Sequence, residues 1–145
     1  MDGLLYQLSV WALPVLLAVT LHEAAHGYVA LRFGDDTALR AGRISLNPLR
    51  HVDPFGTVLL PGLLLFASGM TFMFGFAKPV PVNFARLNNP RRDMVWVAVA
   101  GPAANVAMAL AAGLLLHFTA IFPATAGHWL AINLKNAIFI NALLS

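Results

Sequence analysis

The amino-acid sequence predicts an all-α, multi-pass membrane protein that contains a small β element. Hydrophobic residues make up 59% of the 145-residue chain and charged residues 10%, whereas soluble globular proteins carry roughly 45–50% and about 25%. A soluble domain of this length could not bury that much apolar surface. Long uncharged runs alternate with short polar segments, and the sequence contains no internal repeat. We therefore predict one membrane-embedded domain over residues 1–145.

The first hydrophobic helix is expected over residues 4–33. No charged residue lies between Gly3 and Leu21, and about 20 mostly apolar residues are enough to cross a bilayer as a helix. The helical pattern continues to Phe33, where Gly34 supplies a stop.

Three further helices are expected in the later apolar runs. Residues 57–77 are uncharged and long enough to span, although an internal Pro-Gly pair would also suit a re-entrant segment. The run over 94–134 lacks Lys, Arg, Asp and Glu and is too long for one span. A proline and a glycine divide it, which gives helices over approximately 93–117 and 128–145.

The β element is expected between these helices. Residues 35–54 are polar, and a plausible turn at Ala41-Gly42 precedes the alternating sequence RISL, which predicts a small hairpin. The later sequence KPVPVN, residues 78–83, has alternating prolines that force an extended backbone and remove hydrogen-bond donors. It suits an edge strand to which a substrate strand adds, or a rigid connector at the membrane interface.

The charge pattern limits the partners of the chain. The net charge is +3 and there is no cysteine, which excludes disulfides and thiolate metal sites. No basic patch with interleaved aromatic residues occurs, so no nucleic-acid partner is expected. The basic residues flank the apolar runs and indicate a lipid bilayer. Segments 32–50 and 78–92 each carry four of them, so orientation is undecided if 57–77 spans.

The sequence HEAAH, residues 22–26, is the candidate catalytic motif. Residues four apart share one face of a helix, so His22 and His26 can direct two imidazoles at one zinc ion, with Glu23 beside it as a general base. Glu23 is the only glutamate of the chain, and an acid inside a membrane helix costs roughly 2.5–3.5 kcal/mol. The alternative is a chance match in which both histidines are packed interior residues.

Several stretches extend this motif into a family resemblance. HEAAHGYVALRFGD, GRISLNPLRHVDPFGTVLLPG, GFAKPVPVN and NNPRRDMVWVAVAGPAAN together resemble the site-2 protease family of intramembrane zinc metalloproteases, in particular its small prokaryotic members without a PDZ domain. The resemblance covers residues 20–107. It implies a zinc site that cuts transmembrane protein substrates, in a multi-pass protein of the prokaryotic plasma membrane.

The third zinc ligand is not apparent in the sequence. The family usually takes it from an aspartate in an NxxPxxxLDG-type motif, and no LDG occurs here, so the chain is expected to be truncated within the core. Asp53 and His51 are chemically eligible, but Asp53 is favoured as a cap of the Asp-Pro turn and His51 as a residue that packs or lines the site entrance.

Asn105, in GPAAN, is the remaining candidate. An amide within a membrane helix needs partners, and Asn105 could hydrogen-bond a substrate backbone or a site water. The small residues around it equally suit close helix packing.

The sequence thus predicts a zinc metalloendopeptidase that hydrolyses peptide bonds of transmembrane substrates. The alternative is a non-catalytic membrane fragment or scaffold that lacks the third ligand. A transporter ranks last, because its pathway would need more polar residues on the other helices. A homo-oligomer is compatible with the sequence.

Overall fold

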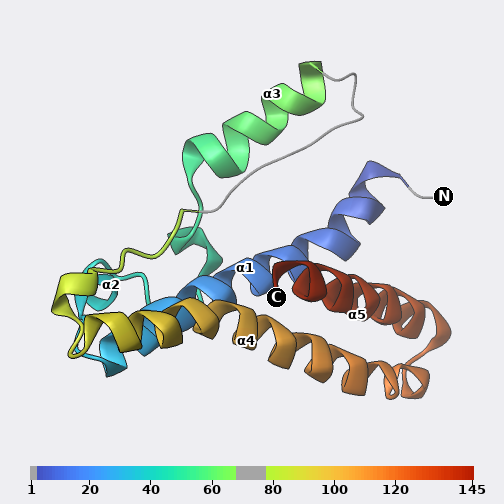
Figure 1. Ribbon diagram of the computed structural model, residues 1–145. Coiled ribbons are helices and arrows are strands. Elements are labelled where there is room, and N and C mark those ends of the chain that lie inside the picture. The colour runs from blue at the N-terminus through green and yellow to red at the C-terminus, as the bar shows by residue number, and fades with distance from the viewer. Residues whose placement is uncertain (1–2, 68–77) are drawn as a thin grey trace.

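The computed structural model describes residues 3–67 and 78–145, and most of them are helical (Figure 1). Three long helices pack against one another: α1, α4 and α5. In Figure 1, α4 runs antiparallel to both α1 and α5. Their bounds are Leu4–Arg32 for α1, Pro90–Leu116 for α4 and Ala124–Leu144 for α5.

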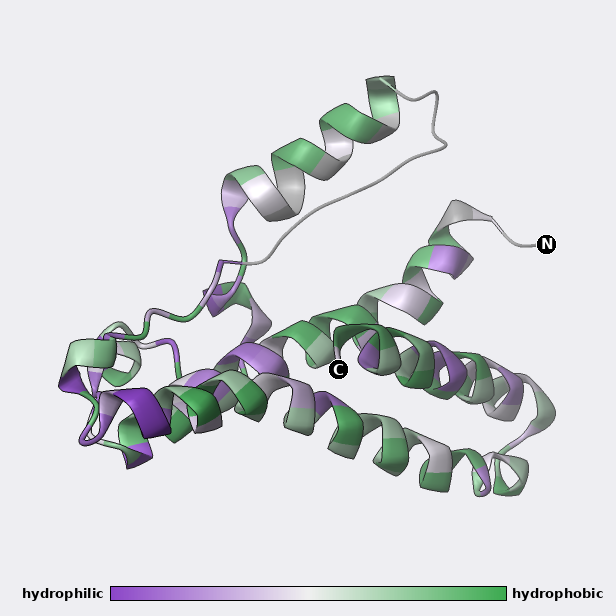
Figure 2. Ribbon diagram, in the orientation of Figure 1, coloured by the Kyte–Doolittle hydropathy of each residue, from purple (hydrophilic) through white to green (hydrophobic). Residues whose placement is uncertain are grey.

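Apolar side chains cover much of the outside of this bundle. Two of the described helices, α1 and α4, are long and apolar enough to cross a membrane, and only 28% and 17% of their most apolar stretches are buried. The core helix of a soluble protein would be mostly buried. Figure 2 shows hydrophobic residues along α4 and hydrophilic residues gathered where α1 ends and α4 begins. These two helices therefore suit a membrane protein.

The predicted end of the first helix is confirmed. Gly34 has φ +102, a conformation that favours glycine. A Cβ at this position would lie 2.7 Å from Asn88 Oδ1. The chain therefore turns sharply here because glycine allows both the backbone angle and the close approach.

The predicted β-hairpin is wrong, since no strand occurs within residues 3–67 and 78–145. The polar segment instead forms α2 (Thr37–Arg40), a turn at Ala41-Gly42 and the 3₁₀ turn η1 (Pro48–Arg50). The first donor of RISL is used locally, because Arg43 N–H donates to Ala38 O over 2.9 Å. Residues 78–83 are extended, but they pair with no strand.

The helix predicted over 57–77 is only partly described. A π-helical turn, η2 (Pro54–Leu59), leads into α3 (Leu60–Ala67). Asp53 Oδ1 accepts from Gly56 N–H over 2.7 Å and caps this turn. Residues 68–77 lie outside the described part of the chain, so the span itself stays a prediction.

The last two predicted helices begin earlier than expected. Helix α4 starts at Pro90, because proline suits the first helical turn and Asp93 Oδ2 accepts from Asn89 N–H over 2.7 Å. Helix α5 follows a 3₁₀ turn, η4 (Thr119–Ile121), and begins directly after Pro123. Gly127 lies inside it rather than before it.

A proline and an asparagine join α1 to α5. Pro14 has no N–H, so the carbonyl of Val10 loses its helical partner. Asn136 of α5 supplies the replacement, because its Nδ2 donates to Val10 O over 2.9 Å. This bond links α5 to α1 at the carbonyl that Pro14 leaves without its helical donor.

We expect Asn136→Leu to lower the free energy of unfolding in detergent by about 1 kcal/mol, because a buried carbonyl loses its donor. In a Pro14→Ala background residue 14 regains its N–H, so the same substitution should have a smaller effect. Chemical unfolding of the wild type, the two single variants and the double variant measures the difference. Equal losses in both backgrounds would contradict this role of Asn136.

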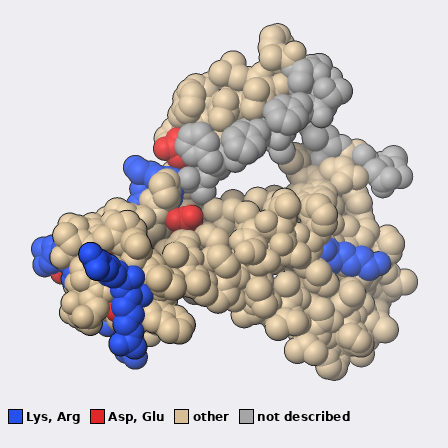
Figure 3. All heavy atoms as spheres, in the orientation of Figure 1, with Lys and Arg blue, Asp and Glu red and all other residues tan. Residues whose placement is uncertain are grey.

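The two basic loops meet at one end of the bundle. Asn88 N–H donates to Phe33 O over 2.8 Å, Asn83 N–H donates to Asp35 Oδ2 over 2.7 Å, and Arg86 pairs with Asp36 over 2.8 Å. Figure 3 shows Lys and Arg gathered at this end. Segments 32–50 and 78–92 are therefore on the same side of the helical body.

Asp35 makes this junction depend on pH. Burial raises the pKa of its carboxyl, but hydrogen bonds from Thr37 and from the Asn83 amide, with the charge of Arg86, outweigh burial and hold the pKa below its ordinary value of 3.8. A lowered pKa stabilises the fold above the unfolded value, and this contribution is lost as the pH falls through the folded value. We expect the melting temperature to decrease when the pH is lowered below 3.8. The decrease should be smaller in Asp35→Asn, which lacks this carboxyl group.

Candidate metal centre

His22 and His26 converge on one point, as their spacing predicts. Both lie on α1, one helical turn apart, and their Nε2 atoms are 3.1 Å apart. Two nitrogens bound at 2.0–2.1 Å to a tetrahedral zinc ion would be about 3.3 Å apart. The pair is therefore spaced as two ligands of one metal ion would be.

Helix α4 fixes which nitrogen of each histidine is free. His26 Nδ1 lies 2.6 Å from Val97 O, and His22 Nδ1 lies 3.0 Å from Asn105 Oδ1. Both oxygens only accept, so both Nδ1 atoms carry the hydrogen. A neutral ring with its hydrogen on Nδ1 presents a lone pair on Nε2. Two lone pairs that face each other at 3.1 Å call for a cation between them.

Gly101 makes room for this arrangement. A Cβ built on Gly101 would lie 2.5 Å from the Nε2 atoms of both His22 and His26. Any side chain here would fill the space where a shared cation belongs. The missing side chain, the free lone pairs and the donor set together fit zinc, with the two histidines as ligands.

Glu23 lies beside the histidines on the flank of α1 that faces residues 78–83. Its Oε2 accepts from Val80 N–H over 2.7 Å, and the side chain is only half-buried. Glu23 thus has one oxygen in a hydrogen bond and remains accessible, which is compatible with the predicted role as a base.

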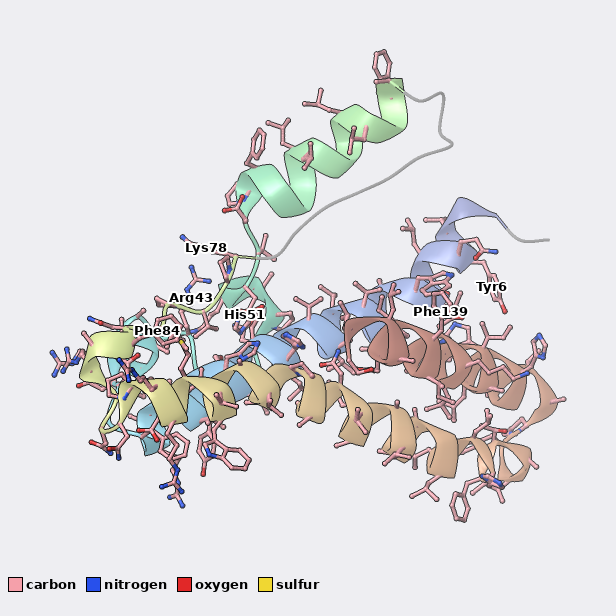
Figure 4. All side chains as sticks on the ribbon, viewed as in Figure 1. Tyr6, Arg43, His51, Lys78, Phe84 and Phe139 are labelled. Atoms are coloured by element: carbon pink, nitrogen blue, oxygen red, sulfur yellow. The ribbon has the colours of Figure 1, made fainter. Side chains whose placement is uncertain are left out.

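No third ligand joins the pair in the described part of the chain. Among residues 3–67 and 78–145 there is no group of three or more His, Cys, Asp or Glu that could hold a metal ion. Asp53 caps η2, as described above. His51 is buried, and its Nε2 donates to Ser45 O over 3.1 Å. Figure 4 shows it near Arg43 and Lys78.

Asn105 orients a histidine in this structure, whereas its predicted contact with substrate stays a prediction. We expect Asn105→Ala to weaken zinc binding roughly 10–100-fold, the usual effect of losing a hydrogen bond to a ligand. Asn105→Asp keeps the acceptor and should restore most of the affinity. Competition with a chelator measures both, and unchanged affinity in the alanine variant would contradict the role.

Sequence reasoning missed three groups of this site: Gly101, the Val97 carbonyl and the Val80 amide. GPAAN predicts close helix packing, and its Gly-Pro pair in mid-helix is the signal for Gly101, because both residues disfavour a helix interior. The other two are backbone groups, and no residue type reveals them.

The fold and the site define a helical protein that has a candidate HExxH zinc centre. Comparison with known proteins points the same way. The chain is 41% identical over 116 residues to "Putative zinc metalloprotease YwhC" of Bacillus subtilis, which covers 78% of this chain and 49% of that protein. It is 34% identical over 131 residues to "Putative zinc metalloprotease Rip2" of Mycolicibacterium smegmatis, which covers 89% and 48%.

The chain is thus similar over most of its length to relatives named as putative zinc metalloproteases, and its resemblance to the site-2 proteases is confirmed. It spans about half the length of the curated relatives it matches. No family model and no solved structure matches the chain.

Proposed function

We propose that the chain is the HExxH part of an intramembrane zinc metalloendopeptidase, which hydrolyses peptide bonds of transmembrane proteins. The observation that carries this proposal is the pair of Nε2 atoms, 3.1 Å apart, opposite a glycine. Zinc, when bound, acts as a Lewis acid and lowers the pKa of water to about 7. His22 and His26 would hold it through their Nε2 atoms.

The residues of the chain supply the proton transfers. Glu23 accepts a proton from the attacking water and then delivers it to the nitrogen of the leaving amine. Val97 O and Asn105 Oδ1 keep both imidazoles in the tautomer that frees Nε2.

An apolar pocket between α1, residues 44–46 and α4 supports a membrane-embedded substrate, although neither histidine lines it. Its volume is about 430 Å³. Its lining includes Ala24 and Ala25 of HEAAH, Tyr28, and Ala104 and Met108 of α4. Small residues let another backbone approach closely, and the apolar lining suits side chains that come from a transmembrane segment.

The protein is proposed to be a multi-pass protein of the prokaryotic plasma membrane, and its charges give an orientation. Eight of its nine Lys and Arg residues fall within 32–92, and both basic loops lie at one end of the bundle. Cytoplasmic loops carry the excess of positive charge. This end, which also lies next to HEAAH, therefore faces the cytoplasm.

Zinc content tests the proposal. We expect about one zinc per purified 145-residue chain in detergent, lost in His22→Ala and kept in the control His117→Ala, because His117 lies at the far end of α4. The wild type should also cleave a purified, tagged single-span membrane protein. Zinc-free wild type, or bound zinc without cleavage, would contradict the proposal.

A non-catalytic scaffold is the second candidate. The observation that favours it is that no third His, Asp or Glu joins the histidine pair among residues 3–67 and 78–145, whereas catalytic zinc sites have three protein ligands. Retention of the single-span protein without cleavage is the result expected of a scaffold.

A further inference from the structure

The extended segment 78–83 has few backbone donors, and three of them, the amides of Lys78, Val80 and Asn83, have acceptors in the structure. Pro79 and Pro81 have no N–H. Lys78 N–H donates to His51 O over 2.9 Å, and Asn83 N–H donates to Asp35 Oδ2 over 2.7 Å. These two bonds anchor both ends of the segment.

Between the anchors, one donor points at the candidate base. Val80 N–H donates to Glu23 Oε2 over 2.7 Å, whereas the amide of Val82 has no acceptor among the described residues. The prolines on either side of Val80 restrict the backbone, so this amide is held in a nearly fixed position.

Gly27, directly after HEAAH, lets the segment come this close to α1. A Cβ on Gly27 would lie 3.0 Å from Val80 Cγ1 and 3.0 Å from Ala38 Cβ. Val80 is buried against this surface, at 8% exposure. A side chain at residue 27 would therefore push the Val80 amide away from Glu23.

We infer that the Val80 amide is a positioning group for Glu23: it holds Oε2, so that the carboxylate is fixed and Oε1 is left to accept the proton of the attacking water. A flexible glutamate would otherwise sample many rotamers. The inference rests on the proposed function, in which Glu23 is the base. Under this inference Gly27 and the alternating prolines both serve to hold the Val80 amide against Glu23.

Amide hydrogen exchange of the valine-labelled chain in detergent tests the contact without any activity. The Val80 amide should be protected in the wild type and in Glu23→Gln, because glutamine keeps an acceptor oxygen. In Glu23→Ala it should exchange roughly tenfold faster or more. The Val82 amide, measured in the same samples, is the internal reference. An unchanged Val80 rate in Glu23→Ala would overturn the inference.

Cleavage of the single-span protein tests whether loss of the Val80 amide slows catalysis. Val80→Pro removes the amide hydrogen, and kcat should fall roughly 10–100-fold, as expected for a misplaced catalytic group, while KM and zinc content stay unchanged. Val80→Ala keeps the amide and should retain most of the activity. Val82→Pro, a matched proline substitution at an amide without an acceptor, should behave like the wild type.

The outcomes separate this inference from the proposed function. Equal kcat losses in Val80→Pro and Val82→Pro would overturn the inference and leave the proposed function intact. If the wild type binds zinc but cleaves nothing, the proposed function fails, and hydrogen exchange alone then decides whether Val80 positions Glu23.

Discussion

Replacing Glu23 by glutamine is expected to abolish measurable cleavage, a loss of roughly 10²–10⁴-fold, while zinc remains bound. An amide cannot take up the proton of the attacking water, although it has nearly the same shape as the carboxylate. Because Gln retains an oxygen that can accept from Val80 N–H, the surroundings of residue 23 should be preserved. Cleavage of the single-span protein and zinc content, measured on one preparation, check both halves of the prediction.

The comparison variant for this experiment is His22→Ala. It should lose both zinc and cleavage, because it removes a ligand rather than the base. Cleavage by Glu23→Gln at the wild-type rate would refute the assigned role of Glu23 even if His22→Ala is inactive. Loss of zinc in Glu23→Gln would instead mean that the carboxylate holds the metal ion.

Local patterns were enough to predict the three long helices α1, α4 and α5 and the convergence of the histidine pair. The four-residue spacing of His22 and His26 places them on one helical face whatever surrounds them, and the structure brings their Nε2 atoms to 3.1 Å. Gly34 ends α1 as predicted, because the need for a positive φ is local to that residue.

Features that depend on contacts between distant segments were not predictable in this way. The alternation in RISL resembles a strand, but a strand needs a partner, and sequence alone does not show that residues 78–83 turn their donors elsewhere. The supports of the histidines come from α4, more than 70 positions along the chain. The capping role of Asp53 was favoured from its local Asp-Pro sequence, and the structure shows that cap.

The equal number of Lys and Arg residues in the two basic loops is a further case in which sequence alone does not decide. Counting charges along the chain places four on each side of residues 57–77, and the count cannot show whether the loops share one side. Hydrogen bonds between 33–35 and 83–88 bring the loops together. This contact turns an undecided charge count into an orientation that reporter fusions can test.

Replacing Gly101 by alanine is expected to eliminate zinc binding. The new Cβ would lie 2.5 Å from both Nε2 atoms, which is too close for a non-bonded carbon and nitrogen. The imidazoles could move away only by breaking their bonds to Val97 O and Asn105 Oδ1. Zinc per chain should therefore fall from about one to less than roughly a tenth, together with cleavage.

Gly113→Ala is the matched control, since Gly113 lies in the same helix and a Cβ there would meet nothing within 4 Å. Alanine is favoured over glycine within a helix by roughly 0.8–1.0 kcal/mol, so neither substitution should unfold α4. Loss of zinc in Gly101→Ala alone would then be due to the space between the histidines. Full zinc occupancy in Gly101→Ala would show that the metal ion does not lie between His22 and His26 opposite α4.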